Sequence, residues 1–402
     1  MVLHMTRVRA ALFIFFCSLT ACTTPPKSPQ GPSQIISSNS VAVDSDVLFV
    51  TQLLNPSKAS DEALLIAPFT DDSVYLLNHR GETLHRWQTG YRNHHAKLGP
   101  DGLLYGLYRH PKMNLRRVAG LIAVHSPEGK QLWSYEDPLL HHTLEPLPNG
   151  HVLALKYKPL PAEQIQGIIK KSTSPAVCDE IAEITPDGKI PWSLTLTDLI
   201  RVDQKYQGIA DPDVLPSLKL SSYCRTNSIR YYEKTVFSDK PAVLISIRHL
   251  SLVLLIEKDS KKILWSSEGL PLLGQHDARI YSEDVLLFNN NAASTPEMNI
   301  ARPSEVLSID LKTKKIKKIF GQKDVMLQDW RSAYMSGASR AANGNTMISI
   351  AEHSQVWELT PDGEMVFKLH LISPKFYYEL GSGFFTAETY PMSFLKERKL
   401  LP

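Results

Sequence analysis

The sequence lacks a dominant charge and a Gly-rich phosphate loop, and after its first 22 residues it has no long apolar run. Its 44 basic and 41 acidic residues give a formal net charge of +3, which is too balanced to indicate a nucleic-acid partner. Without a phosphate loop, no nucleotide cofactor is expected. No stretch keeps the 3.6-residue period of a long helix, and no later segment could span a membrane. These absences favour a globular protein built from β-strands.

The amino terminus has the pattern of an exported lipoprotein. Arg7 and Arg9 precede the apolar run ALFIFFCSL, which is typical of a secretory signal over residues 1–21. The LTAC motif that follows resembles a bacterial lipobox and implies cleavage before Cys22 and acylation of that residue. Acyl chains would hold the protein at a membrane without a spanning helix. Thr23 in the next position favours the outer membrane, facing the periplasm; an ordinary signal peptide with a chance cysteine is the alternative.

Residues 22–45 are predicted to be a flexible tether and residues 46–402 the folded domain. The tether is rich in Pro, Ser and Gln, which cannot bury a core. Only four cysteines are present, and two of them, Cys178 and Cys224, lie in the folded domain. In an exported protein such a pair favours a disulfide over a metal site, with two buried free thiols as the alternative.

A repeat of short strands runs through the folded domain. Asp-Gly and Asn-Gly turns between apolar runs recur in GPDG, LPNG and AANG and favour tight hairpins. A second turn leads to an aromatic residue on an outer strand, and six units fit the chain. Repeated four-stranded units predict an all-β fold, a six-bladed β-propeller with seven blades as the fallback. The strand near Asp46–Leu54 is a candidate for completing the last blade. The recurring aromatic residues are Trp87, Trp133, Trp192, Trp265, Phe320 and Phe367.

Histidine recurs at one position of this repeat. His94, His142 and His276 each stand six residues before the turn of the first hairpin in their unit. The first strand of a propeller blade lines the centre, so we expect the three imidazoles to meet at one mouth. Imidazole can act as a nucleophile, a base or a metal ligand. A zinc enzyme with three histidine ligands is therefore one alternative.

Arginine and asparagine are expected at the same mouth. Arg225, Asn227 and Arg248 belong to the fourth unit, and Arg279 follows the histidine of the fifth. Cations repel a metal ion, whereas guanidinium groups bind sulfate or phosphate oxygens with a planar fork of donors. The mouth is therefore predicted to bind an anion rather than a metal, and to contain few carboxylates.

Several segments together resemble the bacterial arylsulfotransferase family, the aryl-sulfate sulfotransferases that need no nucleotide sulfate donor. The resemblance covers roughly residues 60–392. It implies transfer of a sulfuryl group from a phenolic sulfate to a phenol through a sulfohistidine, without a cofactor. The oligomeric state is not readable. The segments that carry the resemblance are LLHHTLEPLPNGHVLAL, TNSIRYY, LISIRHLSLVLLIEKDSKKILW, GQHDARIYSEDVLLFNNN, NGNTMISIAE and AETYPMSFL.

The resemblance also implies roles for single residues. His276, in its Gln-His-x-Ala context, matches the nucleophile that becomes sulfated. His142 matches a second family histidine, with His141 as the other choice in the pair. Asn227 and Arg248 match the family's asparagine and arginine, whereas the run Asn289–Asn291 is expected to be structural. The further residues expected to bind substrate are His141, Arg225, His94 and Arg279.

Two positions depart from the family pattern. Arg225 stands where the family has a histidine, and Thr143 follows the histidine pair where many relatives carry an acid. An arginine can bind a sulfuryl oxygen but cannot shuttle a proton at neutral pH. The additional N-terminal domain of better-known members is expected to be missing. A non-catalytic propeller lipoprotein that binds a ligand or serves as a scaffold in the envelope is therefore another alternative.

Overall fold

The structure is a computed structural model that describes most of the unit Gln34–Pro402. The other unit, Met1–Ser33, lies outside the described residues, and so do the predicted signal, Cys22 and the tether. Among the helices that are described, none is long and apolar enough to cross a membrane. The described residues are 47–110, 119–160, 176–200, 211–215, 220–222, 224–292, 303–321, 331–373 and 383–401.

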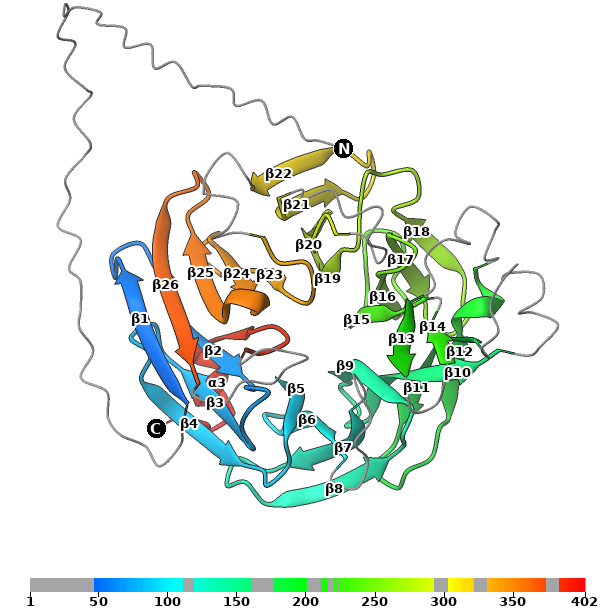
Figure 1. The fold of residues 1–402 in the computed structure, drawn as a ribbon, viewed down its shortest axis with the longest axis horizontal. Helices are drawn as coiled ribbons and strands as arrows, with labels where there is room; N and C mark the ends of the chain where they lie inside the picture. The colour runs from blue at the N-terminus through cyan, green and yellow to red at the C-terminus, as the bar shows by residue number, and fades with distance from the viewer. Residues whose placement is uncertain are drawn as a thin grey trace, which may run out of the picture. The chain divides into compact units, whose positions relative to one another are not determined.

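The described strands form six sheets around a common centre, which confirms the six-bladed propeller (Figure 1). Each blade contains a four-stranded antiparallel core, and in all but one blade the strands of this core follow one another in the chain. Four blades consist of four strands alone, and in three of them the four strands are consecutive in the chain. These three are β5 (Asn93–Leu98), β6 (Leu104–Arg109), β7 (Gly120–His125) and β8 (Gln131–Glu136); β15 (Thr226–Tyr232), β16 (Ala242–Ile247), β17 (Leu252–Glu257) and β18 (Ile263–Ser266); and β19 (His276–Tyr281), β20 (Asp284–Asn289), β21 (Glu305–Asp310) and β22 (Ile316–Phe320).

Both ends of the unit take part in closing the ring. The late strand β27 (Glu388–Pro391) pairs with β2 (Glu62–Ile66) and becomes the innermost strand of that blade, which continues with β3 (Ser73–Leu77) and β4 (Thr83–Gln88). The early strand β1 (Leu48–Leu54) pairs with β26 (Met365–Ile372) as a fifth, outermost strand. The predicted strand near Asp46–Leu54 thus joins the last blade, whereas the role of β27 was not predicted. The last blade also contains β23 (Gly337–Arg340), β24 (Thr346–Ile350) and β25 (Gln355–Leu359), and the helix α3 (Met392–Glu397) follows β27.

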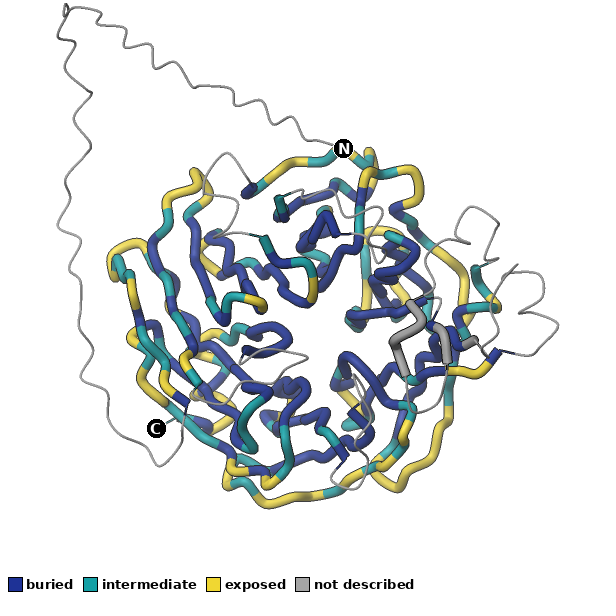
Figure 2. The backbone as a smooth tube through the Cα atoms, viewed as in Figure 1, coloured by how far each residue is buried: buried dark blue, intermediate teal, exposed yellow. Residues whose placement is uncertain are grey.

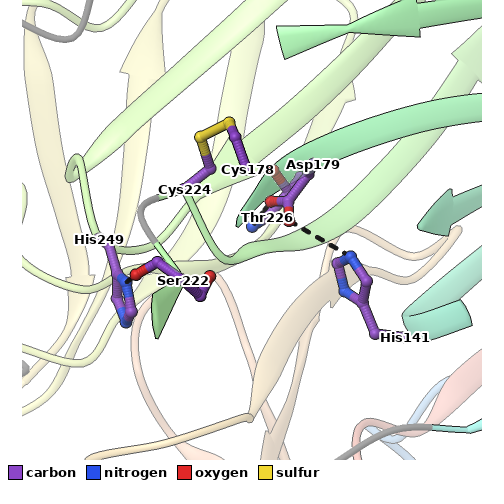
Figure 3. Close-up of a disulfide and its surroundings, with 7 residues drawn as sticks. All are labelled: His141, Cys178, Asp179, Ser222, Cys224, Thr226 and His249. Atoms are coloured by element: carbon purple, nitrogen blue, oxygen red, sulfur yellow. Dashed lines mark hydrogen bonds and ion pairs between the residues drawn. A yellow bond between two sulfur atoms is a disulfide. The ribbon is translucent and has the colours of Figure 1, made fainter. Parts of the chain in front are cut away.

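The remaining blade has additional strands and a disulfide. Its core is β9 (Leu140–Pro146), β10 (Val152–Pro159), β11 (Ala176–Ile184) and β12 (Trp192–Thr195), and β13 (Asp211–Leu215) and β14 (Leu220–Ser222) extend it beside β11. Cys178 of β11 is joined to Cys224, which precedes β15, with Cα atoms 5.1 Å apart (Figure 3). That separation is ordinary for a disulfide. The bridge therefore ties this blade to the next one.

Burial follows the position of a strand within its blade. Inner and middle strands such as β2 and β16 are buried along their whole length, whereas the outer strand β8 alternates between exposed and half-buried residues (Figure 2). The recurring aromatic residues all lie on the fourth strand of a blade core, as predicted, although β1 covers the strand of Phe367 in the last blade. Trp87 of β4 packs with Ala96 and Leu104 of the following blade. Each blade thus buries its face against its neighbour, and the apolar core lies between blades.

Charged side chains from five inner strands meet at the centre of the ring, and we call this set the axial ion network. Arg230 contacts Asp277 at 2.7 Å and Glu388 at 2.8 Å. Arg279 contacts the same two carboxylates at 2.8 Å and 3.0 Å. Lys97 and Glu145 form a further pair at 2.6 Å. The members are Lys97 (β5), Glu145 (β9), Arg230 (β15), Asp277 and Arg279 (β19) and Glu388 (β27).

The sixth inner strand, β23, approaches this network with a glycine. A Cβ atom on Gly337 would lie 2.2 Å from an oxygen of Asp277 and 2.7 Å from the hydroxyl of Thr386. Such distances are far inside ordinary van der Waals contact, so only glycine fits. The requirement for glycine here is spatial, because β23 lies directly against the carboxylate that two arginines hold.

The axial ion network should make stability dependent on pH. Burial alone would raise the pKa of Glu388, but Arg230, Arg279 and Lys97 hold it well below the ordinary 4.5. A carboxyl whose folded pKa is lowered stabilises the fold above its unfolded pKa, and this contribution is lost as the pH falls from about 4.5 towards the folded pKa. We expect Glu388→Gln to lower the free energy of unfolding at neutral pH by about 3–5 kcal/mol. The acid-dependent loss should also become smaller, as measured by urea unfolding at neutral and acid pH.

The exposed pair Lys58–Glu364 supplies a matched control. Its side chains are 49% and 42% exposed, so solvent screens the attraction. Glu364→Gln should therefore leave the urea midpoint nearly unchanged. Similar midpoints for Glu388→Gln and Glu364→Gln would contradict a stabilising role of the network.

Candidate functional site

The site lies where the inner strands of the blades begin. His94 is in β5, His142 in β9, Asn227 in β15 and His276 in β19, and all four are buried. The ring of Phe385, just before β27, lies 6.1 Å from that of His94, 6.0 Å from that of His142 and 6.3 Å from that of His276. The three predicted histidines therefore surround one aromatic ring.

A shared irregularity of the inner strands turns these side chains toward the centre. The pairing register shifts at His94 in β5, at Asn227 in β15 and just after His276 in β19. A similar shift occurs in β9, where His142 has a positive φ of 54°. An additional residue in one strand of an antiparallel pair changes the direction of the side chains beside it. The repeat thus places one bulge beside the site in each of four blades.

Hydrogen bonds fix the tautomer of His276. The amide nitrogen of Asn290 donates to the carbonyl oxygens of Ser332 and Met335, so its oxygen faces His276 Nδ1, at 2.8 Å. That oxygen can only accept, and the Gly274 carbonyl oxygen lies 3.1 Å from the same Nδ1. Nδ1 therefore carries the proton, and the lone pair is on Nε2, where the Met335 N–H donates at 3.2 Å.

The surroundings of His276 keep its ring neutral. Burial and the charges of Arg248 and Arg225 lower its pKa from 6.5 to about 3, although the Asn290 hydrogen bond acts in the opposite direction. A neutral imidazole with a lone pair on Nε2 is the form that can attack an electrophile. Nucleophilic chemistry at neutral pH is therefore open to this residue.

Asn227 holds the chain next to His276. Its amide nitrogen donates to the carbonyl oxygen of Gln275 at 2.7 Å. Gln275 is anchored in turn, because its amide donates to the Ser246 hydroxyl at 3.1 Å and to the Leu252 carbonyl at 3.1 Å. Asn227 thus positions the residue before His276, and among the described residues its amide oxygen has no hydrogen-bond partner.

Arg225 and Arg248 lie side by side. The Arg248 N–H donates to the Arg225 carbonyl oxygen at 3.2 Å, and the two residues are 7% and 2% exposed. The guanidinium of Arg248 lies 5.1 Å from the centre of the Tyr334 ring, which is 44% exposed. Both guanidiniums lower the pKa of His276. Two cations next to a neutral imidazole suit an anionic ligand.

The other two histidines are also neutral. Burial, then the charges of His141 and Arg225, hold the pKa of His142 well below 6.5. Burial and Arg109 do the same for His94. Within the described part of the chain, neither ring nitrogen of His94 has a hydrogen-bond partner. A buried imidazole without partners is available to a ligand at this centre.

Arg279 and the carboxylates differ from their expected places. Arg279 belongs to the axial ion network, where Asp277 and Glu388 balance its charge, rather than to the group around Phe385. The centre also holds more carboxylates than expected, because Asp179 lies 3.3 Å from His141. Across the described ranges, no group of three or more His, Cys, Asp or Glu side chains could hold a metal ion. Within those ranges, His94, His142 and His276 thus do not form such a group.

Two further residues of the site were not assigned to it from the sequence. Phe385 gave no signal, because it lies outside the hairpin repeat and reaches the centre only through ring closure. Asn290 was assigned a structural role with its neighbours, yet its amide oxygen orients the imidazole of His276. The sequence does contain a signal for Asn290, because this residue directly follows the second strand of its blade, β20. That strand pairs with β19, which carries His276, so its end lies beside the site.

Fold and site define a six-bladed β-propeller whose centre gathers neutral imidazoles, two guanidiniums and an amide. The sequence model of the family described as arylsulfotransferase (ASST) matches residues 119–371, and the chain belongs to this family. The predicted resemblance is confirmed, and it supports a function of the aryl sulfotransferase type. No curated protein matches the chain.

Several solved structures are similar in shape. A protein of unknown function from Bacteroides caccae is 14% identical with a TM-score of 0.49, over 82% of this chain and 99% of the other. A virginiamycin B lyase from Staphylococcus aureus is 11% identical with a TM-score of 0.42, over 80% and 88%. The periplasmic gluconolactonase of Pseudomonas aeruginosa is 9% identical with a TM-score of 0.42, over 82% and 98%. At these values none of them bears on the activity.

The protonation of His276 can be measured directly. Because its pKa is lowered to about 3, the ring should stay neutral at every pH above that value. In NMR spectra of protein with labelled histidine, its ring signals should not move between about pH 5 and 8. His276→Gln assigns the signals. A midpoint near the ordinary value of 6.5 would contradict the electrostatic description of the site.

Proposed function

We propose that this protein is an aryl-sulfate sulfotransferase that uses His276 as a transient sulfuryl carrier. The observation that supports this most directly is the fixed tautomer of His276, with a lone pair on Nε2 beside two guanidiniums. The substrates are a phenolic sulfate donor and a phenol acceptor, as the family implies. No cofactor takes part in the proposed steps.

In the first step, His276 Nε2 attacks the sulfur of the donor. The bond between nitrogen and sulfur forms as the bond between sulfur and the phenolic oxygen breaks, and the phenolate leaves with the electron pair. The sulfur replaces the 3.2 Å contact from the Met335 N–H. Arg248 and Arg225 stabilise the charge that moves onto the sulfuryl oxygens. The amide oxygen of Asn290 accepts the hydrogen bond from His276 Nδ1–H as the ring becomes positive.

In the second step, an acceptor phenol takes the sulfuryl group from His276. Such a covalent intermediate divides one difficult transfer into two easier ones and gives ping-pong kinetics. Arg225 cannot remove the proton of the acceptor, so another group has to do so. His142 lies at the same centre and is neutral, which makes it the best-placed proton acceptor.

A second candidate function is ligand binding without catalysis. Arg225 favours it, because two fixed arginines and an amide can hold an anion without any proton transfer. The propeller would then be a binding module of the cell envelope. The two candidates differ in whether a sulfate adduct forms on His276.

Turnover of 4-nitrophenyl sulfate with a phenol acceptor distinguishes the two functions. The wild-type protein should release 4-nitrophenolate and gain the mass of one sulfuryl group when the acceptor is withheld. His276→Ala should lose both signals, and Arg248→Ala should slow the first step on the order of 100-fold or more, the cost of removing one oxyanion donor. Wild-type protein that gives neither adduct nor product with several acceptors would leave the binding module as the function.

We also propose that acyl chains on Cys22 hold the protein at the periplasmic face of the outer membrane. The support is the lipobox-like sequence LTAC with Thr23 after it. In cells, wild-type protein should appear in the outer-membrane fraction, and Cys22→Ala should appear in the soluble fraction or keep its signal. Equal membrane association of both forms would disprove the anchor.

A further inference from the structure

A chain of three buried groups leads away from the site behind His142. His142 Nδ1 lies 2.7 Å from His141 Nδ1, and His141 Nε2 lies 3.3 Å from Asp179 Oδ1 (Figure 3 shows the second contact). His141 and Asp179 are fully buried, and His142 is 8% exposed. None of the steps derived above requires His141 or Asp179, and Asp179 was not singled out from the sequence.

The order of these groups determines where their protons lie. A carboxylate accepts, and neither Asp179 Oδ1 nor His141 Nε2 has a hydrogen-bond partner among the described residues. Their 3.3 Å contact is therefore electrostatic, and it favours a proton on His141 Nε2, which leaves His141 Nδ1 to accept. His142 Nδ1 must then donate to it, which leaves the lone pair of His142 on Nε2. Among the described residues Nε2 has no hydrogen-bond partner, and the ring lies against Phe385 at the centre of the site. His142 is therefore set up to receive a proton from a bound group.

The far end of the chain is rigidly held. Asp179 follows Cys178, whose disulfide reaches Cys224, and the Thr226 N–H donates to Asp179 Oδ2. The ring of Tyr157 stacks on His141, with centres 3.9 Å apart and planes 18° apart. The disulfide, the hydrogen bond from Thr226 and the stacked ring of Tyr157 thus hold Asp179 and His141 in place, so the carboxylate keeps its position relative to the imidazoles.

We propose that Asp179 and His141 are positioning residues that make His142 the proton acceptor of the second step. The inference rests on the proposed function and deepens it. The acceptor oxygen forms its bond to sulfur while its proton moves to His142 Nε2. The bond between sulfur and His276 Nε2 breaks, and its electron pair returns to the ring of His276. The positive charge on His142 is stabilised through His141 by the carboxylate. His142 then returns the proton to the phenolate released from the next donor or to solvent.

This arrangement accounts for Arg225. A residue that cannot shuttle a proton is tolerated at that position if another group does so, and the pair His141–His142 is backed by a buried carboxylate. Arg225 then only binds the anion. The proton pathway and the anion site are thus on different blades, since His142 is in β9 and Arg225 precedes β15.

The test compares the two half-reactions of Asp179→Asn. The first step with 4-nitrophenyl sulfate needs no proton transfer, so the adduct on His276 should form within about threefold of the wild-type rate. Transfer from the pre-formed adduct to unsubstituted phenol should slow on the order of 100-fold, the contribution of a general base. Transfer to the more acidic 4-cyanophenol, measured at a pH above its own pKa but below that of phenol, should slow much less, because this acceptor is then already a phenolate. His141→Gln should give the same pattern.

Glu180→Gln is the matched control. Glu180 is the next residue of β11 and pairs with Lys158 at 3.0 Å, away from His141. The substitution removes the same charge from the same strand and should leave the rates of adduct formation and of transfer to the acceptor unchanged. Thermal melting establishes that each variant is folded. If Asp179→Asn does not fold, His141→Gln decides alone.

Each other outcome overturns the inference. Equal slowing of both steps would give Asp179 a structural role only, and unchanged transfer to phenol would exclude it from proton transfer. If transfer to phenol and transfer to 4-cyanophenol slowed equally, the loss of rate would not come from removal of the acceptor's proton. Failure of the proposed function would look different, because the wild-type protein would then form no adduct at all. In that case the inference would be wrong as well.

Discussion

The structure depends on the neutralisation of buried charge at the centre of the ring. Arg230 and Arg279 share the carboxylates of Asp277 and Glu388, so four charges are paired by several short contacts. Buried charges are tolerated only with such geometry. Because Glu388 is carried by β27, which closes the ring with β2, the same contacts join the two ends of the folded unit.

The network also explains how one strand can serve both the fold and the site. In β19, His276 faces the centre near Phe385, and the next residue, Asp277, faces the two arginines. Asp277 adopts a positive φ of 51°, which the bulge in β19 accommodates. This conformation disfavours ordinary side chains and persists because the ion pairs hold it. A change in the axial ion network should therefore also alter the backbone position of His276.

The propeller fold and the position of the three histidines could be predicted from the sequence, because in a repeat the same local signal occurs several times. Hairpin turns and outer aromatic residues recur in the same order, so six weak patterns specify one propeller. The same alignment placed His94, His142 and His276 at one structural position, where they surround a single ring. Arg279 could not be placed correctly in this way. From the sequence it is a cation near the mouth, whereas the structure pairs it with Asp277 and gives it a structural role.

The sequence by itself determined the strand pattern, favoured six blades over seven, and located the strand ends at which polar residues collect. Periodicity and turn chemistry are local, and they can be read from neighbouring residues. Only the tertiary structure decided what each group faces. Phe385 reaches the centre after ring closure, Asn290 selects the tautomer of His276, and Asp179 stands behind His141 across a blade. These contacts join residues far apart in the chain, and hydrogen-bond direction and buried charge depend on positions in space.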